Sequence, residues 1–199
     1  MSRAFTREPE PGAPGEPPPE RPISEHPNYV TPTGLQQLRD EQEELGRRRV
    51  ELLELLDHAD EQEVPADEEQ VARDKLSYVD RDLRYVQARL ESAIPVDLKT
   101  QPRHEVAFGA TVTVAASGKG LGGASQPAGA QGDSVSLDAR PHQTWSIVGE
   151  DEADPDDGKV SYVSPLAKAL LGAKAGQRVT WHRPAGPLRL TVERILYTS

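Results

Sequence analysis

A run of acidic side chains lies between Asp57 and Glu69. This window holds seven acidic residues and no Lys or Arg, and its acids are Asp57, Asp60, Glu61, Glu63, Asp67, Glu68 and Glu69. Carboxylate oxygens suit Mg²⁺, which is commonly held by one or two of them while water or phosphate fills its other positions. Because crowded like charges repel one another, folding alone does not require this run. Two interpretations follow: a solvated acidic loop, or carboxylates that enter a cationic or metal-containing site on a partner.

Two heptad-patterned segments flank the acidic window and predict an antiparallel helical hairpin with the acids at its tip. Pro65 lies between the segments and has no amide hydrogen, so it favours a break over one continuous helix. Thr31 or Thr33 is the expected cap of the first helix, with Pro32 in the connection or the first turn. The two apolar stripes are Leu35, Leu38, Leu45, Leu52 and Leu56 in the first segment and Leu76, Val79, Leu83, Val86 and Leu90 in the second.

Composition narrows the possible functions. The chain has 199 residues and a formal net charge of −10, and direct binding of nucleic acid is not expected of so acidic a chain, because neutralising phosphates requires clustered Lys and Arg. It has no cysteine, and its five histidines are scattered without the spacing of zinc ligands. No apolar run approaches the roughly 20 residues that cross a bilayer, and the N-terminus lacks the apolar core of a signal peptide. We therefore expect a cytoplasmic monomer without a membrane partner or a cofactor of its own.

The remaining sequence predicts an α+β protein. Residues 1–27 are proline-rich and predict a disordered tail, 28–95 the hairpin, 96–102 a linker, and 103–199 a small antiparallel sheet with one helix. The helix is expected in SPLAKALLG, with Ser164 as cap and Leu166, Ala167, Leu170 and Leu171 facing inward. Residues 115–140 are rich in Gly, Ala and Ser and predict a long excursion from the sheet. No arrangement typical of a nucleophilic or acid–base catalyst is evident, which favours a binding protein over an enzyme.

Several short motifs, in order, resemble the Gre family of transcription elongation factors, GreA and GreB. They are VTPTGLQQLRDEQEEL, DRDLRYVQARLESAIPVD, FGATVTV, WSIVGEDEAD, VSYVSPLAKALLG, AGQRV and PAG. The resemblance implies a coiled-coil hairpin followed by a domain of FKBP-like fold. It also implies that this domain docks at the rim of the secondary channel of bacterial RNA polymerase and that the hairpin enters the channel. Tip carboxylates then help the polymerase to hold its second catalytic Mg²⁺, the polymerase cleaves a backtracked transcript, and nucleic acid is contacted only indirectly.

The tip departs from the family pattern. Members that stimulate cleavage carry a motif of the form GDxxENxxY, whereas this chain reads ADEQEVPADEEQ and is about three residues shorter. The candidate replacements for the family's tip carboxylates are Asp60, Glu61, Asp67 and Glu68. The candidate docking residues in the C-terminal domain are Ser164, Pro165, Leu166, Ala167 and Leu170.

Four functional alternatives stay open at this point. Within the family, the chain either stimulates transcript cleavage or acts as a regulator or inhibitor that enters the channel without promoting cleavage. A more distant alternative is a regulator of nucleoside diphosphate kinase, a label carried by related proteins with shortened hairpins, and the long arms here argue against it. The FKBP-like fold makes prolyl isomerase activity the fourth alternative. Fold does not imply function, however, and no aromatic proline pocket is recognisable in the sequence.

Overall fold

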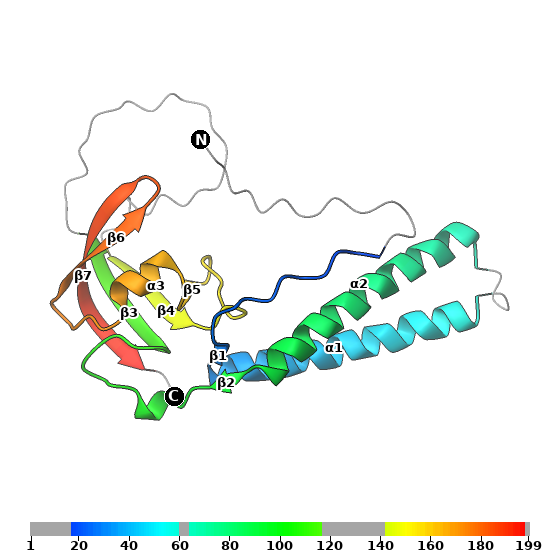
Figure 1. Cartoon of the computed structure of the whole chain (residues 1–199), viewed down its shortest axis with the longest axis horizontal. Helices are drawn as coiled ribbons and strands as arrows, with labels where there is room; N and C mark the ends of the chain where they lie inside the picture. The colour runs from blue at the N-terminus through cyan, green and yellow to red at the C-terminus, as the bar shows by residue number, and fades with distance from the viewer. Residues whose placement is uncertain (1–16, 60–63, 117–141, 198–199) are drawn as a thin grey trace, which may run out of the picture. The chain divides into compact units, whose positions relative to one another are not determined.

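A computed structural model describes residues 17–59, 64–116 and 142–197 of the chain (Figure 1). The chain divides into two compact units, one formed by residues 1–27 and 35–93 and the other by residues 28–34 and 94–199. Asp60, Glu61 and Glu63 of the acidic window lie outside the described residues, as do residues 1–16 of the tail and most of the Gly-rich segment. No helix in the described ranges combines the length and the apolar character needed to cross a membrane.

The two long helices begin and end where the sequence predicts. Helix α1 (Pro32–Asp57) is capped by Thr31, whose hydroxyl oxygen accepts a hydrogen bond from the Gly34 amide at 3.0 Å. Pro32 occupies the first helical position, where no intrahelical amide bond is lost. Helix α2 (Ala66–Glu91) begins directly after Pro65, whose extended backbone (φ −59°, ψ 141°) separates the helices. Each helix has 26 residues and is therefore about 39 Å long at a rise of 1.5 Å per residue.

The predicted apolar stripes form the contact between α1 and α2. Leu38 on α1 and Val79 and Val86 on α2 are buried, and the remaining leucines of both stripes are half-buried. The Arg49 guanidinium donates to the Asp80 carboxylate at 2.7 Å, which joins the middle of α1 to the middle of α2 and fits an antiparallel pair. An exposed ion pair of this kind stabilises by only about 0–1 kcal/mol, so the hairpin depends mainly on its apolar contacts.

The second unit contains a five-stranded sheet with the strand order β5-β4-β3-β7-β6. Its strands are β3 (Ala110–Ala116), β4 (His142–Val148), β5 (Lys159–Ser161), β6 (Arg178–Arg183) and β7 (Gly186–Tyr197). The central strand β3 pairs antiparallel with β4 and β7, and β6 pairs antiparallel with β7. With the helices α1 and α2, this small sheet confirms the predicted α+β class.

Two details of the sheet differ from the sequence prediction. Strand β5 pairs parallel with β4, so the sheet is mixed rather than wholly antiparallel. Alternation of side chains reveals a strand but not the direction of its partner. Here residues 150–158, which we call the acidic turn, return the chain to the start of a short strand. The alternation in VAFGATVTV also predicts a strand from Val106, but the strand begins at Ala110, because Gly109 has a φ of +80°, which interrupts extended backbone.

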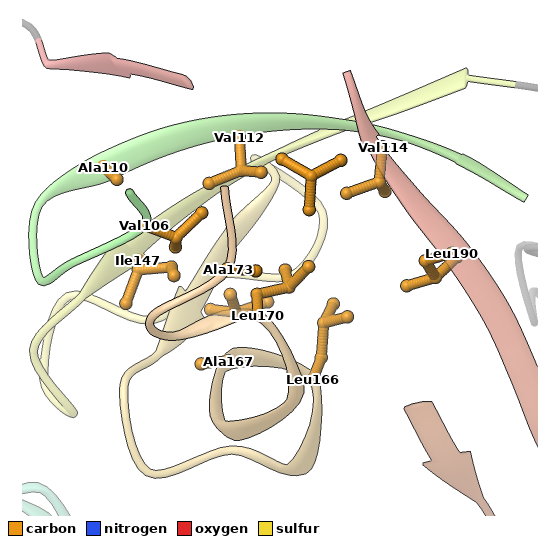
Figure 2. Close-up of a cluster of buried hydrophobic side chains, with 12 residues drawn as sticks. Val106, Ala110, Val112, Val114, Ile147, Leu166, Ala167, Leu170, Ala173 and Leu190 are labelled. Carbon is orange, nitrogen blue, oxygen red and sulfur yellow. The ribbon is translucent and has the colours of Figure 1, made fainter. Parts of the chain in front are cut away.

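Helix α3 (Pro165–Leu170) covers the core of this unit. The Ser164 hydroxyl oxygen accepts from the Ala167 amide at 3.2 Å, and Gly172 ends the segment with a φ of +78°, as the sequence predicts. Figure 2 shows Leu166 and Leu170 among the side chains that fill the space between α3 and the sheet. The prediction for Leu171 is wrong, because its side chain is 36% exposed. The aromatic residues that border this core include Trp145, Tyr162, Trp181 and Tyr197.

The segments predicted as hairpin base and linker form a small structure within the second unit. Strand β1 (Tyr29–Val30) pairs parallel with β2 (Ile94–Pro95), and the single turn η1 (Leu98–Thr100) follows. The Ile94 amide donates to the Asn28 carbonyl at 2.8 Å, and the Val96 amide donates to the Val30 carbonyl at 3.0 Å. Residues 28–34 therefore group with the second unit, whereas the sequence prediction placed them in the hairpin.

The Tyr197 phenol fixes the end of β7 and supports a pH-dependent prediction. Its hydroxyl donates to the Glu105 carbonyl at 2.8 Å and accepts from the Ala107 amide at 2.9 Å. Burial raises the pKa of Tyr197 above its ordinary value of 10.0. Because the folded phenol resists losing its proton, its contribution to stability is complete below pH 10.0 and declines as the pH rises toward the folded pKa.

We therefore expect Tyr197→Phe to lower the free energy of unfolding by about 1–2 kcal/mol at neutral pH, since two hydrogen bonds are lost. The difference between the wild type and the variant should shrink above pH 10.0. Urea unfolding at neutral pH and above pH 10.0 measures the free energy of unfolding of both proteins. It is followed by the fluorescence of Trp145 and Trp181, the two tryptophans of the chain. A difference that grows with pH would contradict the assigned role of the phenol.

Candidate functional site

Backbone hydrogen bonds join the described residues on either side of the hairpin tip. The His58 amide donates to the Glu54 carbonyl at 3.2 Å, which continues the last turn of α1. The Val64 amide donates to the Ala59 carbonyl at 3.1 Å, which joins the residue after the last turn of α1 to the segment that precedes α2. Ala59 is buried.

Three of the acidic residues form the first turn of α2. They are Asp67, Glu68 and Glu69, and negative charge at this position is favourable because it lies at the positive end of the helix dipole. Glu69 also pairs with Arg73 one turn later. Asp67 and Glu68 are exposed, and within the described part of the chain neither forms an ion pair or a side-chain hydrogen bond. Helix stabilisation therefore accounts for part of this acidic turn but leaves two carboxylates available to a ligand.

The described carboxylates cannot form a metal site by themselves. Among the described residues, no group of three or more His, Cys, Asp or Glu side chains is arranged to hold a metal ion. Asp67 and Glu68 are hard oxygen donors of the kind that Mg²⁺ accepts, and one or two such ligands are sufficient where another molecule supplies the rest. A cation site at Asp67 and Glu68 would therefore need ligands from another molecule, and Asp60 and Glu61 lie outside the described residues.

The second candidate site, the segment Ser164–Leu170, divides into buried and exposed residues. Leu166, Ala167 and Leu170 are buried in the core, and their side chains hold α3 on the sheet. Pro165 is exposed, and the Ser164 side chain is occupied in capping the helix. The accessible side of α3 continues through Lys168 to Leu171. The segment is therefore mainly a structural element, with a small exposed face.

The structure also brings together residues that the sequence did not connect. Glu152 lies in the acidic turn after β4, and its carboxylate accepts hydrogen bonds from the Thr31 amide at 2.9 Å and from the Thr31 hydroxyl. The Gly149 amide donates to the same carboxylate at 3.3 Å. A Cβ on Gly34 would lie 2.0 Å from the Glu152 side chain, so the close approach requires glycine. Glu152 thus positions the residue that caps α1.

Three aromatic rings form a further cluster on the same unit. The Tyr29 ring lies 5.5 Å from the Tyr162 ring and 6.0 Å from the Phe108 ring, and Phe108 lies 5.9 Å from Tyr162, measured between centroids. These distances and the tilted planes are typical of favourable aromatic pairs. The three rings come from separate segments of the chain. The sequence shows that each residue is aromatic but not that the three rings meet.

Comparison with known proteins connects both units to one family. The family model described as "Transcription elongation factor, GreA/GreB, C-term" matches residues 131–197. A transcription elongation factor GreA from Roseiflexus castenholzii is 31% identical over 176 residues, which cover 87% of this chain and 99% of that protein. GreA from Francisella tularensis subsp. novicida is 30% identical, and the match covers 84% of this chain and 95% of the relative.

Among solved structures, the GreA factor homolog 1 (Gfh1) protein of Thermus thermophilus is similar at 19% identity, with 86% of this chain and 99% of that chain covered and a TM-score of 0.36. The family assignment rests on the sequence relatives, which span the hairpin as well as the C-terminal unit and are matched over nearly their whole length. The chain therefore belongs to the GreA/GreB family of transcription elongation factors.

Proposed function

We propose that this Gre-family protein binds bacterial RNA polymerase, with its hairpin tip in the secondary channel and its C-terminal unit docked at the channel rim. The observation that carries the proposal is the position of Asp67 and Glu68, two exposed carboxylates without partners in the described residues, in the tip-proximal turn of a 26-residue helix. Apart from the favourable interaction with the helix dipole, no ion pair or side-chain hydrogen bond among the described residues uses these two charges. A long two-helix arm can carry them into a site on a partner.

The tip carboxylates would act by sharing a cation with the polymerase. Mg²⁺ bound there would activate water and polarise a phosphate oxygen. Asp67 and Glu68, with Asp60 and Glu61, supply oxygen ligands and negative charge on one side of that site. The chain contributes these ligands and their placement, and we infer that it has no complete catalytic site of its own. Nucleic acid is then reached only through the polymerase complex.

We assign docking to the exposed face of α3 rather than to its whole length. Leu166, Ala167 and Leu170 cannot contact a partner without leaving the core, so they support the surface indirectly. Pro165, Lys168 and Leu171 are exposed and offer a cation between two apolar side chains. The immediate test is association of the full chain with purified RNA polymerase, and Lys168→Glu should weaken it. Clean absence of association would overturn the proposed function.

The divergent tip gives a specific reason to keep a second candidate function, a channel-binding regulator that does not promote cleavage. Stalled, backtracked transcription complexes distinguish the two. Shortened transcripts on addition of the protein would show stimulation of cleavage. Unchanged transcripts together with slower initiation or elongation would show a channel blocker. Stimulation is the expected result if the tip carboxylates reach the catalytic Mg²⁺.

The fourfold substitution of Asp60, Glu61, Asp67 and Glu68 by Ala tests the role of the tip. We expect it to reduce the stimulated cleavage rate by about 100-fold or more while binding to polymerase persists, because loss of even the outer-shell partners of a metal costs about 10–100-fold. Cleavage rate and affinity are measured in parallel. The matched control removes four exposed carboxylates from the shaft of α1 and should retain cleavage; these are Glu41, Glu43, Glu51 and Glu54. Activity that survives the tip substitution would refute the carboxylate mechanism.

A further inference from the structure

Residues 17–27, which we call the strap, contact helix α2 through Glu20 and Arg21. The Arg21 guanidinium carbon lies 3.7 Å from the centroid of the Tyr85 ring, and the Arg21 guanidinium is 3.7 Å from the Asp82 carboxylate. The Glu20 carboxylate accepts two hydrogen bonds from the Arg84 guanidinium, at 2.6 and 3.2 Å. The strap and α2 belong to the same compact unit, and Figure 1 shows the strap passing along α2.

The strap and helix α2 are complementary in charge and in the geometry of their contacts. Neighbouring strap residues of opposite sign, Glu20 and Arg21, meet α2 residues of opposite sign, Arg84 and Asp82. An arginine stacked on an aromatic face adds a contact that depends on geometry as well as on charge. Pro18 is buried, so the strap also makes apolar contact. A proline-rich segment is largely extended before it binds, so it loses less conformational entropy when it becomes ordered on α2.

These contacts are suited to a reversible attachment. The Glu20 and Arg84 side chains are 64% and 57% exposed, and ion pairs in water are weak and screened by salt. The strap lacks regular hydrogen-bonded structure over residues 17–24, so no backbone ladder adds to the side-chain contacts there. We therefore expect attached and released forms of the strap to exist in equilibrium.

We propose that the strap is an autoinhibitory element of the hairpin, an inference that rests on the proposed insertion of the hairpin into RNA polymerase. The attached strap adds a third chain to the cross-section of a two-helix arm and covers the side of α2 around Tyr85. A partner that encloses the hairpin must displace it. The apparent affinity is then the intrinsic affinity reduced by the fraction of molecules with a released strap.

The attachment is tested without polymerase. Because the chain has no cysteine, Ile23→Cys gives one site for a nitroxide label next to the strap contacts. In the labelled full chain, we expect paramagnetic broadening of the amide signals of α2 residues 81–88. Glu20→Arg should remove the broadening, and the charge swap Glu20→Arg with Arg84→Glu should restore it. Glu25→Arg makes the same charge change at a strap position without a described contact and should leave the broadening unchanged. Absence of broadening in the labelled chain without further substitutions would refute the attachment of the strap to α2.

The inhibitory effect is tested by the affinity of the unlabelled proteins for RNA polymerase. We expect Glu20→Arg to bind about 3–10-fold more tightly than the wild type, as for a competent state populated at roughly 10–30%. The charge swap should return to the wild-type affinity, and Glu25→Arg should match the wild type. Equal affinities despite a released strap would overturn autoinhibition. If no variant binds polymerase, the proposed function and autoinhibition both fail, whereas the broadening experiment still decides whether the strap attaches.

Discussion

Leu170→Ala is expected to lower the free energy of unfolding of the C-terminal unit by about 2–5 kcal/mol. The Leu170 side chain is fully buried between α3 and the sheet, in a cluster that includes Val112, Val114 and Ile147 (Figure 2). Truncation removes apolar contacts and leaves a cavity that the packed valines cannot fill without moving. Urea unfolding monitored by tryptophan fluorescence reports on this unit, since both tryptophans, Trp145 and Trp181, lie in its sheet.

The adjacent leucine supplies a matched control. Leu171 follows α3 directly and is 36% exposed, so Leu171→Ala should change stability by less than about 1 kcal/mol. The two variants remove the same atoms from neighbouring positions, and only burial distinguishes them. Similar losses for both would show that α3 is not oriented as described. Weaker polymerase binding by Leu171→Ala, without a stability loss, would support the exposed face of α3 as the docking surface.

Glu152→Ala is expected to lower the stability of the second unit by about 2–3 kcal/mol. The carboxylate accepts hydrogen bonds from the amide and the hydroxyl of Thr31 and from the amide of Gly149, and bonds to a charged acceptor contribute about 1.5–3 kcal/mol. We discount their sum because the group is half-buried and water can replace part of the interaction. Loss of the carboxylate also frees Thr31, the residue that caps α1, to leave its capping position.

Asp156→Ala is the control for Glu152→Ala. Asp156 lies in the same acidic turn, is exposed, and uses only its backbone amide in a described hydrogen bond. Its replacement should change stability by no more than about 0.5 kcal/mol. Gly34→Ala should resemble Glu152→Ala, since the added methyl group would displace the same carboxylate. A neutral result for Glu152→Ala would mean that this carboxylate does not hold the start of the hairpin.

Local chemistry decided those features that the sequence predicted correctly. The heptad leucines define the contact face of each helix, because a helix repeats every 3.6 residues whatever surrounds it. Thr31, Pro65, Ser164 and Gly172 act through their own hydroxyls, missing amide hydrogen or permitted backbone angles, so the ends of the helices could be predicted from single residues. The family motifs likewise identified the family from the order of short segments.

Tertiary structure decided which residues meet across the chain. Glu152 and Thr31 are 121 residues apart, and neither has a local pattern that indicates the other. Leu170 and Leu171 are chemically identical neighbours, and only the sheet beneath α3 makes one a core residue. The parallel pairing of β5 and the grouping of residues 28–34 with the second unit also depend on distant partners. The sequence by itself determined the helices and their family, because those signals are local. Pairing, burial and the contacts of the strap required the fold, since each is a relation between segments that only folding brings together.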